Sequence, residues 1–226
     1  MGGKMMLQTE LNELFARWKA ARGYGRGFAA DGPVEPERYV SEKTKILFVL
    51  KEPSNSDFEA LGGLIGWLKD PASEYGSTWN MVGRWAGEML SAPIDTDASG
   101  QALRDEANER LARVAVMNVK KVNPQPRTDA LDLATYAAQD ADWIRTEIGL
   151  LSPDVIVGCG VQTELVWLLG IRPDELKARE MPHGMLYVVK RPGQVVLLTR
   201  HPMMAPKALG PELYQAWQEA GEISPG

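Results

Sequence analysis

Cysteine, histidine and long apolar segments are scarce in this chain of 226 residues. Cys159 is the single cysteine, and His183 and His201 are the two histidines. One thiol cannot form an internal disulfide, and so few thiol and imidazole ligands argue against an iron–sulfur cluster or a zinc centre, so we expect no metal or cofactor. No run approaches the roughly 18 apolar residues of a membrane-spanning helix, and residues 1–10 lack the pattern of a signal peptide. The sequence therefore predicts a soluble, cytoplasmic protein.

Basic residues are outnumbered by acidic ones. The chain has 25 lysines and arginines against 30 aspartates and glutamates, a net charge of -5. Wrapping long duplex DNA draws on many phosphate contacts, so this balance disfavours such binding by charge alone, although local basic clusters remain open. The length and the 44% of hydrophobic residues exclude disorder across the whole chain. We expect a single domain over residues 1–226.

Strand and helix patterns alternate along the sequence. Apolar runs typical of strands lie at residues 45–50, 113–119 and 154–160, and a hairpin is predicted for 186–190 and 195–199. Apolar residues at helical spacing predict helices over about residues 7–18 and 79–89. A third helix is predicted after Thr128, a candidate N-cap, with an apolar stripe that continues to Leu151. Strands separated by helices predict an α/β fold of three layers, α/β/α, with a mainly parallel central sheet.

Residues 22–39, rich in glycine, proline and charge, are interpreted as a long loop after the first helix, which Gly23 ends. An arginine, glycine and aromatic mixture of this kind can bind single-stranded nucleic acid. The alternative is a helix cap followed by a connector. The N-terminal helix and loop, residues 1–44, thus precede the segments with the stronger patterns.

Polar residues follow each predicted strand. In an open parallel sheet, ligands bind at the carboxyl ends of the strands, where successive loops converge. We therefore expect one cleft to be faced by the residues at these ends, which are Lys51, Glu52, Pro53, Ser54, Asn118, Lys120, Lys121, Gly158, Gly160, Arg200, His201 and Pro202.

Four segments resemble, in order, the motifs of the uracil-DNA glycosylase superfamily. ILFVLKEPSNS is similar to a strand followed by a GEAPG or GINPG loop, and VAVMNVKKVNPQPR is similar to a strand ending in TNxVK. DVIVGCGVQTE is similar to a strand that enters a helix through small residues, and VVLLTRHPMM is similar to a strand ending in HPS. YGSTWNMVGRWAGEML is a weaker match between the first two. The resemblance covers about residues 45–205 and implies a divergent member of this fold without iron–sulfur cysteines.

This resemblance implies hydrolysis of the N-glycosidic bond of uracil or another deaminated base in DNA, with the base flipped from a single-stranded or locally opened strand. It implies that His201 donates to the developing oxyanion of the base, that Asn118 reads the base edge and that Trp79 stacks on the base. Glu52 would orient or deprotonate water. The other residues expected to contact substrate are Lys51, Pro53, Ser54, Lys120 and Arg200.

The sequence departs from the family pattern in its first and last motifs. Lys51 stands at the glutamate of GEAPG, Glu52 stands at the asparagine of GINPG, and Met203 replaces the serine of HPS. Two other functions therefore stay open. One is a non-catalytic member that binds single-stranded nucleic acid or a protein partner. The other is a hydrolase or transferase that acts on a free nucleotide.

Each site residue also has a structural interpretation. Glu52 is then a solvated loop acid, His201 a strand cap, Asn118 a partner of loop amides and Trp79 a core residue, while His183 is more typical of a turn. Seven basic residues near predicted loop ends could together form a track that binds phosphates, and the alternative is ordinary surface charge. They are Lys120, Lys121, Arg127, Lys190, Arg191, Arg200 and Lys207. Gly158 and Gly160 are interpreted as small residues for close helix packing, and Cys159 as a buried apolar residue.

Overall fold

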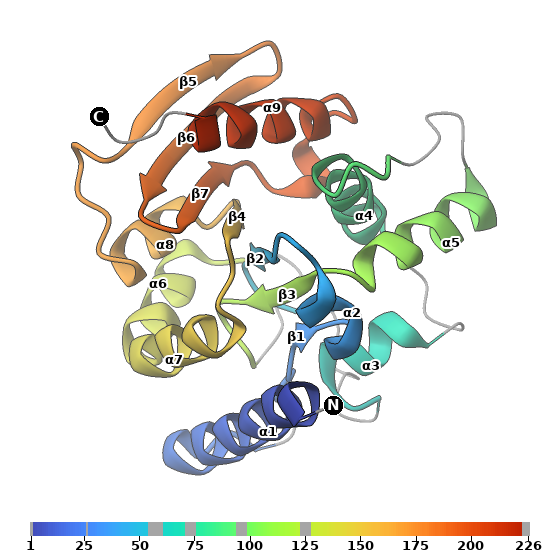
Figure 1. The fold of residues 1–226 in the computed structure, drawn as a ribbon. Coiled ribbons are helices and arrows are strands. Elements are labelled where there is room, and N and C mark those ends of the chain that lie inside the picture. The colour runs from blue at the N-terminus through green and yellow to red at the C-terminus, as the bar shows by residue number, and fades with distance from the viewer. Residues whose placement is uncertain are drawn as a thin grey trace.

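The computed structural model describes residues 2–25, 27–53, 61–70, 76–93, 99–122 and 128–222. The helices in these ranges are α1 (Gly2–Arg22), α2 (Pro36–Ser41), α3 (Gly63–Lys69), α4 (Ser77–Met89), α5 (Gly100–Leu111), α6 (Ala130–Gln139), α7 (Ala141–Leu151), α8 (Gln162–Leu168), the 3-10 helix η2 (Pro202–Met204) and α9 (Leu209–Glu222). The strands are β1 (Gly32–Pro33), β2 (Ile46–Leu50), β3 (Ala115–Asn118), β4 (Val155–Cys159), β5 (Lys177–Met181), β6 (Gly184–Arg191) and β7 (Gln194–Thr199). The α/β class is therefore confirmed (Figure 1).

The strands form one mixed sheet in the order β1-β3-β2-β4-β7-β6-β5. The four central strands, β3, β2, β4 and β7, are parallel, whereas β1, β6 and β5 run antiparallel to their neighbours. The parallel centre agrees with the prediction of a mainly parallel sheet, and the strands at the edges are antiparallel. The reason is local, since β5, β6 and β7 are joined by tight turns, and only antiparallel strands can be joined that way. The hairpin of β6 and β7 is confirmed, with Gly193 at φ +72° in its turn.

Both faces of the central strands are buried under helices. Phe48 of β2 belongs to an apolar cluster with residues of α3, α4 and α9, and its neighbours Leu47 and Val49 belong to a second cluster with residues of α1, α6, α7 and α8. Because successive strand residues point to opposite faces, the two clusters lie on opposite sides of the sheet. The apolar stripe of α1 is confirmed, with Leu11 and Trp18 fully buried in the second cluster.

The helix predicted after Thr128 is two helices. The N-cap is Asp129, whose side chain accepts from the backbone N–H of Asp132, and the helix is interrupted at Asp140. The carboxylate of Asp140 is buried, where it accepts a hydrogen bond of 2.6 Å from the hydroxyl of Tyr24 and lies 2.8 Å from Nε of Arg22. The break therefore lets Asp140 anchor the end of α1 and the segment that follows.

Residues 22–39 are only partly the loop expected from their composition. The segment contains β1 and the start of α2, and Phe28 is buried against Phe15 and Trp18. The buried Phe28 side chain is not available to stack on a nucleic-acid base. The segment connects the first helix to the sheet, as the alternative interpretation expected.

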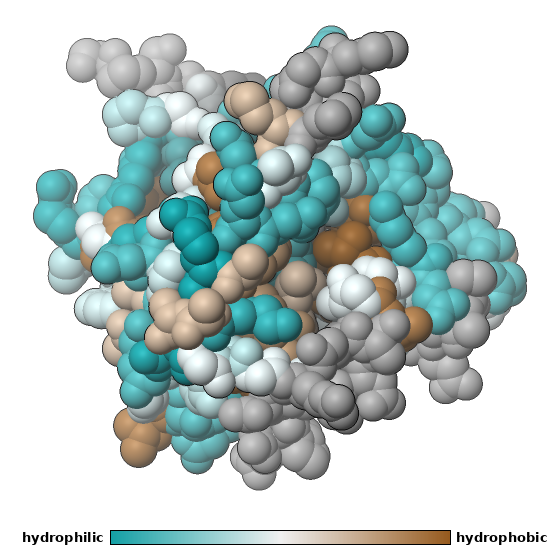
Figure 2. Space-filling view, turned by 90° about the horizontal axis from the view of Figure 1, so that it is seen from below, coloured by the Kyte–Doolittle hydropathy of each residue, from teal (hydrophilic) through white to brown (hydrophobic). Residues whose placement is uncertain are grey.

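Within the described ranges, no helix is both long and apolar enough to cross a membrane. On the face seen in Figure 2, the coloured hydrophobic residues form separate patches between hydrophilic ones. The part of that face described by the structure therefore offers no continuous apolar surface.

Candidate functional site at the strand ends

The carboxyl ends of the four parallel strands lie at one edge of the sheet. Leu50 at the end of β2 is opposite Asn118 at the end of β3, and Cys159 at the end of β4 is opposite Thr199 at the end of β7. Residues that follow these ends therefore share the same edge. Those residues are Lys51, Glu52, Pro53, Lys120, Gly160, Arg200 and His201. Ser54 lies outside the described residues.

His201 and Lys51 meet at Gly160. Gly160 has φ +73°, and a Cβ atom built on it would lie 3.2 Å from Cβ of His201, 3.2 Å from its backbone nitrogen and 3.2 Å from Cε of Lys51. No residue larger than glycine fits there without displacing one of these neighbours. Gly160 is thus the point where the ends of β2, β4 and β7 approach one another. Gly158 is close-packed as expected, since a Cβ there would lie 2.6 Å from Leu165.

The imidazole of His201 is half-buried and is held by a hydrogen bond from the backbone two residues further along the chain. Its Nδ1 accepts a hydrogen bond of 3.3 Å from the backbone N–H of Met203. Burial, and next the positive charge of Lys51, lower the pKa of His201 below its ordinary value of 6.5. At neutral pH the ring is therefore mostly uncharged. Because Nδ1 is an acceptor, the neutral ring carries its proton on Nε2, which makes Nε2 a hydrogen-bond donor.

Glu52 is buried in an ion pair and is not a solvated loop acid. Its side chain is 4% exposed, and its Oε2 lies 3.0 Å from Nζ of Lys120. Nζ of Lys120 also lies 2.5 Å from Oδ2 of Asp132 and over the ring of Tyr136. Burial by itself would lower the pKa of Lys120, but hydrogen bonds with Asp132 and Glu52 outweigh it and raise that pKa. Oε1 of Glu52 is buried without a hydrogen-bond partner among the described residues.

Asn118 has a buried amide nitrogen with no hydrogen-bond partner in the described part of the chain. The residue is 1% exposed, and its backbone N–H donates to Oδ2 of Asp31 over 2.7 Å. The other oxygen of Asp31 lies 2.5 Å from Nζ of Lys121, which lies 2.8 Å from Oε2 of Glu147. A buried donor without an acceptor costs free energy, so the side chain of Asn118 is a candidate ligand-binding group.

The buried cluster behind Asn118 holds two carboxyl groups and one ammonium group. Burial, and next the charge of Asp31, raise the pKa of Glu147 well above its ordinary value, against the opposing effect of Lys121. Burial alone would lower the pKa of Lys121, but the charges of Asp31 and Glu147 raise it. Lys121 is therefore charged, and Glu147 holds its proton to higher pH than an ordinary glutamate.

These contacts divide the site into two groups. His201 and Lys51 lie together at the ends of β7 and β2, and Glu52 lies with Lys120 beside the end of β3, which carries Asn118. Two strands separate β3 from β7, so the backbones of Asn118 and His201 are about 14 Å apart at the usual strand spacing. Lys51 and Glu52 stand between them. A ligand that touches both Asn118 and His201 must therefore lie across the ends of β2 and β4.

Trp79 and Arg200 belong to neither of these two groups. Trp79 is 7% exposed and packs within the apolar cluster of α4, although α4 contacts the 3-10 helix that follows His201. Arg200 is exposed, and its guanidinium group lies over Gly184 at the start of β6. The structural interpretation of Trp79 therefore has direct support from packing.

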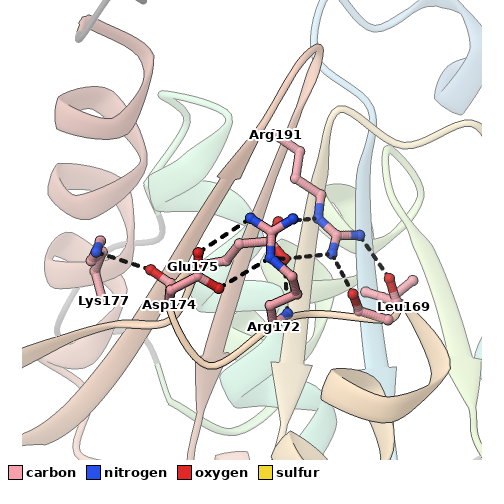
Figure 3. Close-up of polar contacts among 7 residues, drawn as sticks. Leu169, Arg172, Asp174, Glu175, Lys177 and Arg191 are labelled. Atoms are coloured by element: carbon pink, nitrogen blue, oxygen red, sulfur yellow. Dashed lines mark hydrogen bonds and ion pairs between the residues drawn. The ribbon is translucent and has the colours of Figure 1, made fainter.

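The phosphate track expected from the sequence is interrupted. Lys120 and Lys121 are buried in ion pairs, and Arg127 lies outside the described residues. Arg191 is held by Glu175 at 3.2 Å and by the carbonyls of Leu169 and Gly170, within the network shown in Figure 3. These side chains are committed to the fold, so they do not form a continuous basic surface.

Sequence reasoning missed the acidic partners of the site, Asp31, Asp132 and Glu147. Glu147 carried a readable signal, because it lies on the apolar stripe of α7 between Ile144 and Ile148. Asp31 carried none, since its partners are far away in the sequence. Among the described residues, no group of three or more histidine, cysteine, aspartate or glutamate side chains is arranged to hold a metal ion. No protein-family model and no curated protein matches this chain.

Proposed function

We propose that the protein hydrolyses the N-glycosidic bond of uracil or another deaminated base in DNA, as a divergent protein of the three-layer uracil-DNA glycosylase type. The observation that carries the proposal is the neutral imidazole of His201, with Nε2–H available beside Lys51 at the strand ends. The resemblance of four segments to that superfamily gives the reaction class. The alignment of the carboxyl ends of those four segments on one side of the sheet supports it.

The chemistry requires charge to be stabilised on the departing base. As the bond between the sugar C1′ and the base nitrogen breaks, the electron pair leaves with the base, and negative charge develops on a base oxygen. A fixed donor near that oxygen stabilises the transition state more than the ground state. The Nε2–H of His201 is such a donor, and the ammonium group of Lys51 adds a favourable charge at the same end of the site.

Glu52 is assigned to the attacking water. The water oxygen forms the new bond to C1′, and Oε1 of Glu52 accepts the proton that the water releases. This oxygen has no hydrogen-bond partner among the described residues. Lys120 holds the other oxygen and fixes the orientation of the carboxylate. The partnerless Nδ2 of Asn118 is assigned to a carbonyl oxygen at the base edge, because cytosine carries an amino donor at that place and would leave the Asn118 amide mispaired.

The experiment uses oligonucleotides that carry uracil, hypoxanthine, xanthine or a thymine mismatch, followed by alkaline cleavage of abasic sites. We expect at least one lesion to be processed. His201→Ala should slow excision by about 100-fold or more, as for the loss of one oxyanion donor. Its melting temperature and circular dichroism should match those of the parent protein. Unchanged turnover in this variant would remove His201 from the mechanism.

A second candidate function is the binding of single-stranded nucleic acid without catalysis. The ion pair between Glu52 and Lys120 favours it, because it gives the Glu52 carboxylate a role in the fold that needs no catalysis. In this case no lesion is processed, and single-strand binding persists and weakens steeply with salt. If neither occurs but nucleotides raise the melting temperature, the result favours a hydrolase or transferase that uses this site for a free nucleotide.

A further inference from the structure

A hollow of about 380 Å³ lies beside helix α8, on the face of the sheet that carries the second apolar cluster. Helix α8 packs against β4, whereas β6 lies two strands further out in the sheet. This outer part of the face is therefore incompletely covered, and Tyr187 of β6 is only half-buried there. The hollow is lined by Gln162, Thr163, Val166, Leu176, Tyr187 and Leu198.

Both sides of the hollow are held in place by hydrogen bonds. On the α8 side, Nε2 of Gln162 donates to the backbone carbonyl of Thr199 over 2.7 Å. On the other side, Nε of Arg191 donates to Oε1 of Glu175 over 3.2 Å, within the network of Figure 3, and Leu176 is the next residue along the chain. Because these contacts fix the two walls, the hollow is formed without a ligand, as is usual for small-molecule sites.

The lining combines an apolar interior with unused polar groups. Three of its side chains are aliphatic, and Tyr187 contributes an aromatic ring. The hydroxyl groups of Thr163 and Tyr187 have no hydrogen-bond partner among the described residues, and Oε1 of Gln162 remains an acceptor because Nε2 is used on the backbone. Among the described residues, none of the side chains that line the hollow is charged. A matching ligand is therefore uncharged, with an apolar body and polar groups at its edge.

We propose that this hollow binds an uncharged heteroaromatic ring, of the kind found in the base of a nucleoside. The faces of such a ring suit Tyr187 and the aliphatic walls, and its edge carries donors and acceptors for the hydroxyl groups and Gln162. A lipid chain would leave these polar groups unpaired, and a sugar would leave the aliphatic side chains without an apolar partner. The inference does not depend on base excision, because the hollow is lined by none of the residues assigned to that reaction.

Binding to the full chain is measured by amide NMR spectra and calorimetry during titration with adenosine and with uridine. We expect a dissociation constant on the order of 0.1 mM, from the efficiency typical of ligands of this size. The amide signals that shift should belong to α8, β6 and β7. Adenosine 5′-monophosphate should bind no more tightly than adenosine, since the lining offers no cation to the phosphate.

Two variants change the lining, and a third is the matched control. Val166→Trp fills the hollow from α8 and should abolish detectable binding. Tyr187→Leu removes the aromatic ring and should weaken binding by about 10-fold, the size expected for one base–aromatic stack. Val188→Trp is the control, because Val188 points to the opposite face of β6 and lines a separate groove of about 230 Å³ with Ala216 and Ala220 of α9. This control should bind like the parent protein.

Melting temperature and circular dichroism identify a variant that does not fold, and in that case the positions of the shifted NMR signals in the parent protein decide. The inference is overturned if neither nucleoside shifts any signal at several millimolar, or if the shifted signals lie away from the hollow. It is equally overturned if Val188→Trp weakens binding as much as Val166→Trp. Displacement of adenosine by cyclohexanol or ribose at equal concentration would assign the hollow to an apolar ligand or a sugar instead, and binding of the monophosphate without binding of adenosine would assign it to a phosphate.

Discussion

Replacing Gly160 by alanine tests the contact on which the strand-end site depends. The added Cβ would lie 3.2 Å from two atoms of His201 and from Cε of Lys51, and φ is +73°. The left-handed backbone costs an alanine about 1–2 kcal/mol relative to its preferred region. The end of the flexible Lys51 side chain can move, but the backbone nitrogen and Cβ of His201 cannot move without shifting the strand end. Overpacking of this kind adds about 1–3 kcal/mol.

Gly170 provides the matched control for this experiment. It has φ +59°, and nothing lies within 4 Å of the position of an added Cβ. Gly170→Ala therefore lowers the free energy of unfolding only through the left-handed backbone and adds no steric overlap. Urea unfolding of both variants should show Gly160→Ala less stable than Gly170→Ala by about 1–3 kcal/mol with unchanged m values. Equal midpoints for the two variants would refute the close approach of His201 and Lys51 at Gly160.

Two further predictions concern the groups around β3. Asn118→Asp should change the preference among lesions rather than lower every rate, because it replaces an amide donor by an acceptor; equal loss on all four substrates would assign Asn118 a structural role. The pKa of Glu147 is raised by burial and by Asp31, so the folded protein holds this proton to higher pH than the unfolded chain does. The parent protein should lose stability relative to Glu147→Gln as pH rises from about 5 to 8. Parallel stability curves for parent and variant would contradict this assignment.

Much of the central sheet could be predicted from the sequence. The apolar runs at residues 45–50, 113–119 and 154–160 contain β2, β3 and β4 in full. Such runs are readable because a strand that is buried on both faces must be apolar at every position. The hairpin was equally readable from its turn. β5 escaped prediction because it is an edge strand with the mostly charged sequence KAREM, and an edge strand is not covered on both faces.

The candidate site was predictable in its position but not in its pairings. Lys51, Glu52, Asn118 and His201 were recognisable as polar residues at strand ends. That His201 would meet Lys51, and not Glu52, depends on the order of strands in the sheet, which places β7 beside β4. The ion pair of Glu52 with Lys120 depends in the same way on the neighbouring position of β3.

The sequence by itself determined the four central strands, the apolar stripes of α1 and α4 and the polar residues that end the strands. These properties follow from local spacing along the chain and the need to bury apolar side chains. Only the tertiary structure decided that Glu52 is buried, that Glu147 joins Lys121 and Asp31, and that Glu212 orients His183. Pairings of this kind join residues far apart in the chain, and a charge is stable in the interior only where the fold brings it a partner.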